Sequence, residues 1–476
     1  MSGALVNWAV IGAYFALTLW LGERVGRRRG DLDEYFLAGR GMPWWVIALS
    51  IVGTETSTLT FVGVPAIAYA GNLTFLQVAL GYVVGRFLVA WWLVPAYFTG
   101  GVRTAYEILA VRFGLGARKL ASGVFLVSRA LADGVRLFAT ALVLQAMLPM
   151  SLATAVVGVL VVTFAYTVRG GLRAVIWNDA MQLAVYVGGA TLALVVLMGR
   201  LPSGLGATLV DLGASDKLQV LSFAWDWTNP YLFWSGLIGG AVLTMATHGT
   251  DQMFVQRLLA CADAPTARRA VIASGVLVFF QMALFLLIGT YLFAFYSIAP
   301  PAQPFTSNDQ IFARFIVEEL PIGLAGLVIA AVFAAAMSTL SSSMSSIASA
   351  VTLDFLGGGQ GDATAALRTS RLATAGAAIA LAVVAWLAQA WGSVLEAGLT
   401  ITSVTFGGVL GVFLLAASGL SIPGWAIATA MLTGQAVALF LQQTTALAWT
   451  WLTPAGALTT LLIGGAAALL GGRRDG

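Results

Sequence analysis

The stretch GTETST, residues 53–58, decides the fold of this chain, because it interrupts an apolar run that is otherwise long enough to cross a membrane. The run extends over residues 43–70, and a bilayer-crossing helix needs about 20 largely apolar residues. Glycine lacks side-chain restraint, and serine and threonine hydroxyls bond to nearby backbone, so we predict that the helix unwinds here and releases carbonyl oxygens. Glu55 lies within the stretch, and an ionisable side chain at membrane depth is costly enough to mark a functional site.

The composition places the rest of the chain in a membrane as well. Of its 476 residues, 59% are apolar and only 9% are charged, and the mean hydropathy is +0.92, whereas about 25% of residues are charged in soluble domains. Apolar runs recur from Leu5 to Leu470, so we predict one transmembrane domain over residues 1–476 and no enzyme domain. A single cysteine, Cys261, and a single histidine, His248, argue against a disulfide framework and against metal or redox centres. We therefore expect neither enzyme activity nor a cofactor.

Thirteen apolar runs are long enough to span a bilayer, which predicts an all-α polytopic membrane protein of about 13 transmembrane helices. They cover residues 5–23, 43–70, 74–98, 120–147, 151–168, 175–199, 231–256, 270–297, 321–352, 369–389, 393–416, 422–441 and 449–471. Runs of this length exclude a transmembrane barrel, whose strands alternate over about ten residues.

Lys and Arg are distributed unevenly over the loops between these spans. With the loop after the first span taken as cytoplasmic, eighteen of them fall inside, among them Arg27, Arg28, Arg29, Arg473 and Arg474. Only three fall outside, namely Arg200, Lys217 and Arg314. The positive-inside rule then predicts a multi-pass protein of the plasma (inner) membrane with its N-terminus outside and its C-terminus in the cytoplasm. Because this topology accounts for the net charge of +4, we expect no nucleic-acid partner.

A second stretch, TMATHGTD at residues 244–251, has the same small, polar and ionisable make-up as the first break. Two interrupted helices five positions apart in the helix order are typical of inverted-repeat transporters. We predict an extra N-terminal helix over 5–23, a first repeat over 43–199, an inverted second repeat over 231–416, and two further helices over 422–471. The alternative is that both stretches are polar helix-packing patches.

Hydroxyl-bearing residues line one face of the predicted helix over 321–352. The face carries, at helical spacing, Ala335, Ser338, Thr339, Ser342 and Ser346. A desolvated sodium ion needs several neutral oxygens, and these hydroxyls together with carbonyls of an unwound helix would supply them. The alternative is a stripe of small residues that lets helices approach closely.

Three ionisable residues, Arg129, Asp133 and Arg136, share one face of the predicted helix over 120–147. One pair can neutralise itself, and the second cation would bind a substrate carboxylate or a buried acid; a purely structural ion network is the alternative. We favour Arg136 for the substrate because it lies deeper. His248 in the second break would donate to a substrate oxygen or titrate near neutral pH, unless it is a satisfied interhelical histidine. The substrate-binding candidates are therefore Glu55, Ser57, Arg136, Thr247 and His248.

Motifs that follow one another along nearly the whole chain point to a known family. They are GMPWW at 41–45, SIVGTETS at 50–57, FVG at 61–63, YE at 106–107, RF at 112–113, GGLRAV at 170–175 with Asp179 and Gln182, TDQ at 250–252, VQR at 255–257, Ala335 to Thr339 with Asp354, and Gly407 to Phe413. Together they resemble the sodium:solute symporter family, which includes sodium-coupled glucose, proline, sialic acid and iodide carriers.

The resemblance implies a LeuT-type fold of five plus five inverted-repeat helices and a specific sodium site. The site implied consists of the carbonyls of Gly53, Thr56 and Ala335 and the hydroxyls of Ser338 and Thr339. Some relatives use a second sodium site, whose matching positions here are Asp179, Ser341 and Ser342. Asp179 also begins a predicted helix, where the dipole favours a carboxylate without any ligand. The aromatic cluster of the sugar carriers is replaced by Thr247 and His248, which weakens a sugar assignment.

These observations lead to the hypothesis of a sodium-driven carrier that imports a small organic solute, which we expect to bear a carboxylate, by alternating access. Its expected partners are the solute, sodium as the only metal ion, and the lipid bilayer, with no obligate protein partner. Proton coupling through Glu55 or His248 is one alternative. A membrane sensor or channel with the same fold is another alternative; it would require a signalling domain, which we do not expect in this chain.

Overall fold

The computed structural model describes residues 2–26, 32–202, 204–301, 303–357, 363–390 and 394–471. Within these residues the chain forms helices and no strands, which confirms the predicted all-α class. Five of the arginines that set the predicted orientation, Arg27, Arg28, Arg29, Arg473 and Arg474, lie outside the described residues.

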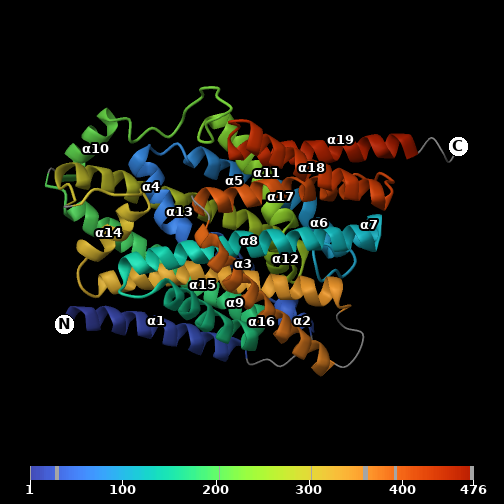
Figure 1. The fold of residues 1–476 in the computed structure, drawn as a ribbon, viewed down its shortest axis with the longest axis horizontal. Helices are drawn as coiled ribbons and strands as arrows, with labels where there is room; N and C mark the ends of the chain where they lie inside the picture. The colour runs from blue at the N-terminus through green and yellow to red at the C-terminus, as the bar shows by residue number, and fades with distance from the viewer. Residues whose placement is uncertain are drawn as a thin grey trace.

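Nineteen α-helices follow one another along the described parts of the chain (Figure 1). Their bounds are α1 Ser2–Gly26, α2 Leu32–Leu37, α3 Trp44–Glu55, α4 Thr58–Ala70, α5 Leu76–Leu88, α6 Val94–Phe98, α7 Glu107–Phe113, α8 Leu115–Met147, α9 Leu152–Gly199, α10 Gly204–Ala214, α11 Gly240–Thr250, α12 Gln252–Leu259, α13 Ala264–Ile298, α14 Gln310–Glu318, α15 Leu324–Ala350, α16 Ala363–Leu387, α17 Val394–Ala417, α18 Gly424–Thr444 and α19 Leu452–Gly471. Short 3-10 turns cover Ala38–Arg40, Ala388–Ala390 and Trp449–Trp451, and π-helical turns cover Val89–Leu93, Ser235–Gly239 and Val351–Phe355.

By length and apolar composition, ten helices among the described residues can cross a membrane, or eleven if the bent pair Leu32–Arg40 and Trp44–Glu55 is one span. This number differs from the thirteen predicted spans. The predicted spans 151–168 and 175–199 form one 48-residue helix, α9, in which Gly171 leaves helical geometry at φ 57° and ψ −159°. The predicted spans 43–70 and 231–256 are each divided by a break into shorter helices.

Both breaks lie in the predicted stretches and have a local cause. Helix α3 ends at Glu55, and Thr56 and Ser57 are extended before α4 begins. Helix α11 ends at Thr250, and the extended Asp251 starts α12 by accepting the backbone N–H of Met253 at 2.8 Å. A side-chain oxygen at this position satisfies one of the N–H groups that a helix start leaves unpaired.

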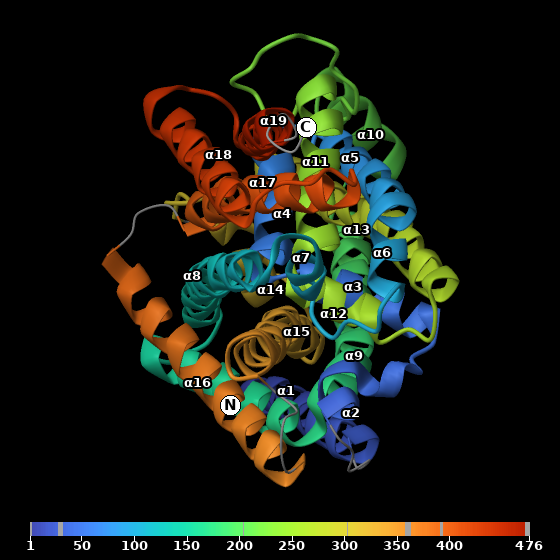
Figure 2. The ribbon, with the colours of Figure 1, turned by 90° about the vertical axis from the view of Figure 1, so that its right-hand side faces the viewer.

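Helix α15 lies in the interior of the bundle. Of its most apolar 18-residue window, 89% is buried, and it packs against α1, α8, α9 and α16. Figure 2 shows α15 enclosed by these helices. Because α15 is covered on all sides, its many serine hydroxyls face other helices and not lipid.

The helices run mostly along one direction, which defines two ends of the molecule. The N-terminus of α1 lies at the same end as α10 and α14, whereas α7 and the end of α19 lie at the opposite end (Figure 1). The first and last described helices therefore begin and end on opposite sides of the bundle.

Candidate functional site

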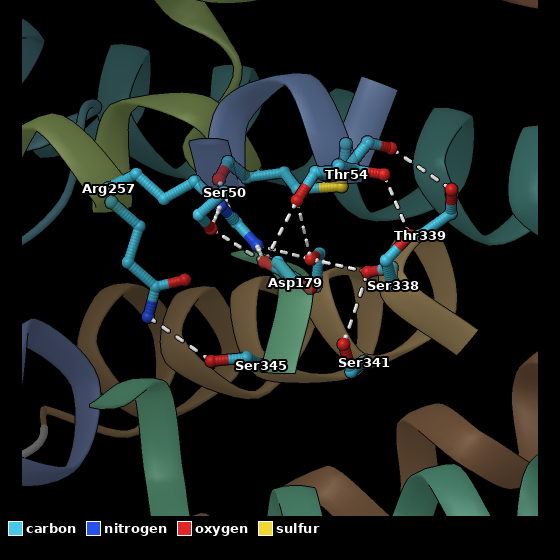
Figure 3. Close-up of polar contacts among 12 residues, drawn as sticks. Ser50, Thr54, Asp179, Arg257, Ser338, Thr339, Ser341 and Ser345 are labelled. Carbon is cyan, nitrogen blue, oxygen red and sulfur yellow. Dashed lines mark hydrogen bonds and ion pairs between the residues drawn. The ribbon is translucent and has the colours of Figure 1, made fainter. Parts of the chain in front are cut away.

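The first part of the site lies where the end of α3 meets the middle of α15. Ser338 Oγ donates to the carbonyl oxygens of Gly53 at 2.7 Å and Ala335 at 3.2 Å. Thr339 Oγ1 donates to the carbonyl oxygens of Thr54 at 3.0 Å and Ala335 at 3.3 Å (Figure 3). Five neutral oxygens from two helices thus converge in a fully buried place.

The break after Glu55 explains why these carbonyls are available. The last four carbonyls of an α-helix have no partner within the helix. At the end of α3 the Val52 carbonyl accepts from the N–H and from the hydroxyl of Thr56, at 3.1 Å and 3.0 Å. The next two carbonyls, of Gly53 and Thr54, are left for the hydroxyls of α15.

Four of the five predicted ligands of the main sodium site are therefore brought together, and Thr54 is an addition that the sequence analysis missed. The signal was present in the sequence, since consecutive hydroxyls at 338 and 339 can meet consecutive carbonyls at 53 and 54. Thr56 lies at the break itself, where its hydroxyl is also bound by Gln281 Nε2 at 2.5 Å. The carbonyl of Thr56 is not among the oxygens that contact Ser338 or Thr339.

Close beside these oxygens lies Asp179 of α9, one of the candidates for a second sodium site. Its Oδ2 accepts from Ser50 Oγ at 2.6 Å, Thr54 Oγ1 at 3.2 Å and Arg257 Nη2 at 2.8 Å (Figure 3). A Cβ on Gly53 would lie 2.8 Å from the Asp179 carbonyl oxygen, so glycine there allows α3 and α9 to approach. Asp179 therefore lies inside the protein and is paired with a cation of α12.

The other two candidates for the second site, Ser341 and Ser342, lie on α15. Ser342 Oγ is bound by Arg257 Nη2, lies 3.0 Å from Thr54 Oγ1 and donates to the Ser338 carbonyl at 2.7 Å. Ser341 Oγ donates to the same carbonyl at 3.1 Å. The guanidinium of Arg257 thus contacts both Asp179 and Ser342, a pairing that the sequence analysis did not anticipate.

A cavity lies on the other side of the α3 break. It is lined by Thr54, Glu55, Leu59, Thr60, Gly63, Val64, Ile67, Phe75, Tyr82, Arg129, Arg136, Tyr231, Leu243, Thr244, Thr247, His248, Met253, Phe254, Met282 and Thr402. Four of the five predicted substrate candidates, Glu55, Arg136, Thr247 and His248, are in this wall. Ser57 is not, since its side chain is buried with Oγ 3.5 Å from Thr60 Oγ1.

The two arginines of the cavity wall belong to an ion network that includes an acid from the second break. Arg129 is paired with Asp251 and lies 3.4 Å from Asp133 Oδ2. Arg136 Nη1 donates to Asp133 Oδ1 at 2.8 Å. Two cations therefore face two acids, because Asp251 supplies the second negative charge that α8 itself does not provide. Arg136 is 21% exposed, compared with 3% for Arg129, and thus presents more of its guanidinium to the cavity.

Glu55 and His248 meet Arg86 of α5 at another part of the wall. Glu55 Oε2 is ion-paired with Arg86 Nη2, and the same nitrogen lies 3.0 Å from His248 Nε2. Arg86 Nη1 donates to Ser274 Oγ at 3.0 Å. Arg86 is fully buried. Through its contacts with Glu55, His248 and Ser274 it connects both breaks to α5 and α13.

The cavity leads toward the end of the bundle where α1 begins. A second hollow, lined in part by Asn72, Asn308 and Asp309, shares Gly63, Ile67 and Tyr231 with the cavity wall. Asp309 directly precedes α14, which lies at that end (Figure 1).

Polar contacts tie the helices together toward the opposite end. Asp354 accepts from Thr104 Oγ1 at 2.7 Å, Ser122 Oγ at 2.7 Å and Arg118 Nε at 2.8 Å. Arg118 Nη2 also donates to Glu107 of α7 at 2.9 Å.

Comparisons with known proteins agree with this architecture. The sequence pattern of the Sodium:solute symporter family matches residues 35–418. The sodium/sialic acid symporter SiaT of Proteus mirabilis is 30% identical over 361 residues, which are 73% of this chain and 71% of that protein. The mouse (Mus musculus) sodium-coupled monocarboxylate transporter 2 is 28% identical over 429 residues, covering 87% of this chain and 67% of the relative. A solved structure of a Na+-coupled sialic acid symporter in a substrate-bound outward-open state superposes with a TM-score of 0.90 at 26% identity, over 98% of each chain.

Proposed function

We propose that this chain, which belongs to the sodium:solute symporter family, carries a carboxylate. As a member of that family it is a sodium-coupled symporter of a small organic solute, and it has the LeuT-type fold. It is a multi-pass membrane transporter and not an enzyme. Sodium is its coupling ion. In the proposal sodium binds between α3 and α15, and the solute binds in the cavity beside the α3 break.

The proposed main sodium site uses the carbonyls of Gly53, Thr56 and Ala335 and the hydroxyls of Ser338 and Thr339. The convergence of four of these groups at the end of α3 supports the assignment. All are neutral oxygens, which suit a desolvated monovalent cation at the junction of an interrupted helix. The Thr54 carbonyl, which accepts from the Thr339 hydroxyl, is an additional candidate ligand.

A second sodium site at Asp179, Ser341 and Ser342 is a further part of the proposal. Oδ1 of Asp179 is buried and has no hydrogen-bond partner in the described part of the chain, so one carboxylate oxygen is available to an ion. Oδ2 is bound by Arg257. A second sodium ion would therefore share Asp179 with an internal guanidinium.

The carboxylate of the solute is assigned to Arg136. Only Nη1 of this guanidinium is used by Asp133, and the side chain lines the cavity. A guanidinium with spare N–H groups binds a carboxylate in a charge-assisted, geometrically specific way. The names of the two relatives, a sialic acid symporter and a monocarboxylate transporter, are consistent with an acidic solute.

The observation that carries the coupling is the position of Glu55. It follows Gly53 and Thr54, whose carbonyls contact α15, and its own side chain lines the cavity. An ion that holds these carbonyls against α15 would therefore also fix the cavity wall that the solute meets. Sodium binding and solute binding would stabilise the same arrangement of α3, which is what coupling between two ligands requires.

The remaining assignments concern topology. We place residues 43–199 and 231–416 in two inverted repeats, with extra helices at 5–23 and 422–471, all within one domain; the breaks at 56–57 and 251 support this pairing. We place the N-terminus outside and the C-terminus in the cytoplasm of the inner membrane. The opposite ends of the bundle at which α1 begins and α19 ends (Figure 1) support the placement of the two termini on opposite sides of the membrane, and the distribution of Lys and Arg assigns the cytoplasmic side.

Reconstitution tests the proposal. The protein in liposomes is challenged with carboxylates, amino acids and sugars in sodium or potassium, and thermal stabilisation and counterflow are measured. We expect stabilisation by carboxylates in sodium only. Stabilisation that ignores the cation and uptake driven by a pH gradient would instead support proton coupling, with Glu55 as the first residue to neutralise.

A further inference from the structure

The surroundings of Glu55 define a chemical requirement on the solute, an inference that rests on the proposed function. We infer that Arg86 holds Glu55 as a charged hydrogen-bond acceptor in the cavity wall, so that the transporter selects carboxylates that also carry a hydroxyl or ammonium donor.

The two oxygens of the Glu55 carboxylate have different environments. Oε2 is ion-paired with Arg86 and lies 3.7 Å from His248 Nε2. Oε1 has no hydrogen-bond partner within the described residues, and unlike the fully buried unpaired atoms of the protein it keeps some exposed surface. Since the Glu55 side chain is 17% exposed and lines the cavity, the unpaired oxygen is accessible from there.

Arg86 keeps this carboxylate charged. The guanidinium is 0% exposed, and Nη1 is fixed by Ser274 of α13. A buried arginine stays protonated and requires a counter-charge. Glu55 supplies it, since Arg86 has no other carboxylate partner among the described residues.

His248 is unable to take over the role of donor to the solute. The Thr247 hydroxyl donates to the Leu243 carbonyl at 3.0 Å, so its oxygen accepts the proton on His248 Nδ1, 3.0 Å away. Nε2 then accepts from Arg86 at 3.0 Å. Both ring nitrogens are used within the protein, and the ring stacks on Phe254 at 4.1 Å between centroids.

Glu55 is the one carboxylate among the described residues that line the cavity, where it stands with the cationic Arg129 and Arg136. A carboxylate accepts hydrogen bonds and donates none. A solute that covers Oε1 without offering a donor removes water from a charged oxygen and does not replace the lost hydrogen bond, which disfavours binding of that solute. A solute with a carboxylate for Arg136 and a donor for Glu55 satisfies both charges.

The test compares carboxylates that differ only in a donor. Thermal unfolding of the purified full chain in sodium is titrated with L-lactate, L-alanine and propionate, and with N-acetylneuraminate as a larger acid. A hydrogen bond to a charged group corresponds to about a ten- to hundredfold change in affinity. We expect lactate or alanine to reach half-saturation at a concentration at least about tenfold below that of propionate.

Variants connect this preference to the wall. Replacing the ion pair as a unit, Glu55→Met with Arg86→Met, avoids leaving an unpaired buried charge and should reduce the preference to within about threefold. Glu55→Gln, which keeps the shape of the side chain, should weaken it less. The matched control replaces the ion pair of Glu34 and Arg173, which joins α2 to α9 outside the cavity, by methionines and should leave the preference unchanged.

The outcomes separate this inference from the proposed function. Equal half-saturation by propionate and its donor-bearing partners would overturn the donor requirement and leave a carboxylate transporter. Absence of stabilisation by every acid in sodium would overturn both. If N-acetylneuraminate alone stabilises the protein, its affinity is compared between the Glu55 and Arg86 variant and the Glu34 and Arg173 control. A loss of affinity only in the Glu55 and Arg86 variant supports the role of Glu55, and an equal loss in the control refutes it.

Discussion

Removal of the Ser338 hydroxyl should raise the sodium requirement without abolishing the fold. In Ser338→Ala the ion loses one of five proposed oxygens, and Gly53 loses the 2.7 Å hydrogen bond that joins α3 to α15. A contact between a dipole and a charge is worth about 1.5–3 kcal/mol, taking hydrogen bonds to charged groups as the measure. Since about 1.4 kcal/mol is tenfold in affinity, the sodium concentration for half-maximal uptake should rise about ten- to hundredfold.

The assay is uptake into proteoliposomes at saturating solute, with sodium varied against potassium at constant ionic strength. Ser346→Ala is the matched control, because Ser346 is equally buried on the same hydroxyl stripe of α15, but within the described residues its hydroxyl donates to the Ser343 carbonyl at 3.1 Å and contacts no oxygen of α3. Both variants lose a neutral hydrogen bond worth about 1 kcal/mol of stability. If Ser338→Ala and Ser346→Ala share the same sodium dependence as the unaltered protein, the assignment of Ser338 as a sodium ligand is refuted.

Three further perturbations probe other parts of the site. Arg136→Ala should raise the half-saturating solute concentration by about tenfold or more in uptake assays, since it removes a charge-assisted contact, and an unchanged value would exclude Arg136 as the carboxylate partner. Asp179→Asn leaves Arg257 buried without a counter-charge, which costs about 3–5 kcal/mol of folding free energy, so the unfolding temperature should fall clearly. If a second ion binds at Asp179, the Hill coefficient for the sodium dependence of uptake should also fall, from about two to about one. Arg118→Ala removes the ion pairs of Arg118 with Asp354 and with Glu107, so a cysteine placed at the buried Ala105 should be labelled faster. An unchanged labelling rate would mean that these two ion pairs do not limit access to that end of the bundle.

The sequence is most informative where polar and ionisable residues interrupt the apolar runs that form membrane helices. Gly53 to Thr58 and Thr244 to Asp251 are polar within apolar runs, and both stretches contain a break. The stripe on α15 was predicted from helical spacing, and two of its hydroxyls contact the carbonyls that the first break exposes. These features depend on neighbours in sequence, so they can be read without a tertiary structure.

Several pairings were missed because they join residues far apart in the chain. Nothing in the sequence indicates a partner for Arg86, yet in the structure it binds Glu55 and His248. Arg257 was noted only as part of a motif, yet it contacts Asp179 and Ser342. Helical spacing shows which residues share a face but not which face of another helix they meet. The span count differs for another reason, because the predicted spans 151–168 and 175–199 continue as one 48-residue helix and breaks divide two other predicted spans into shorter helices.

By itself the sequence determined that this is an all-helical membrane protein, where its two interrupted helices lie, and which hydroxyls are available to an ion. Composition, apolar run length and helical periodicity are local properties, and they suffice for these conclusions. Only the tertiary structure decided that Arg257 neutralises Asp179, that Asp251 balances Arg129, and that Arg86 leaves one oxygen of Glu55 accessible to the cavity. The physical reason is that a buried charge is tolerated only with a partner, and in this bundle most of those partners come from another helix.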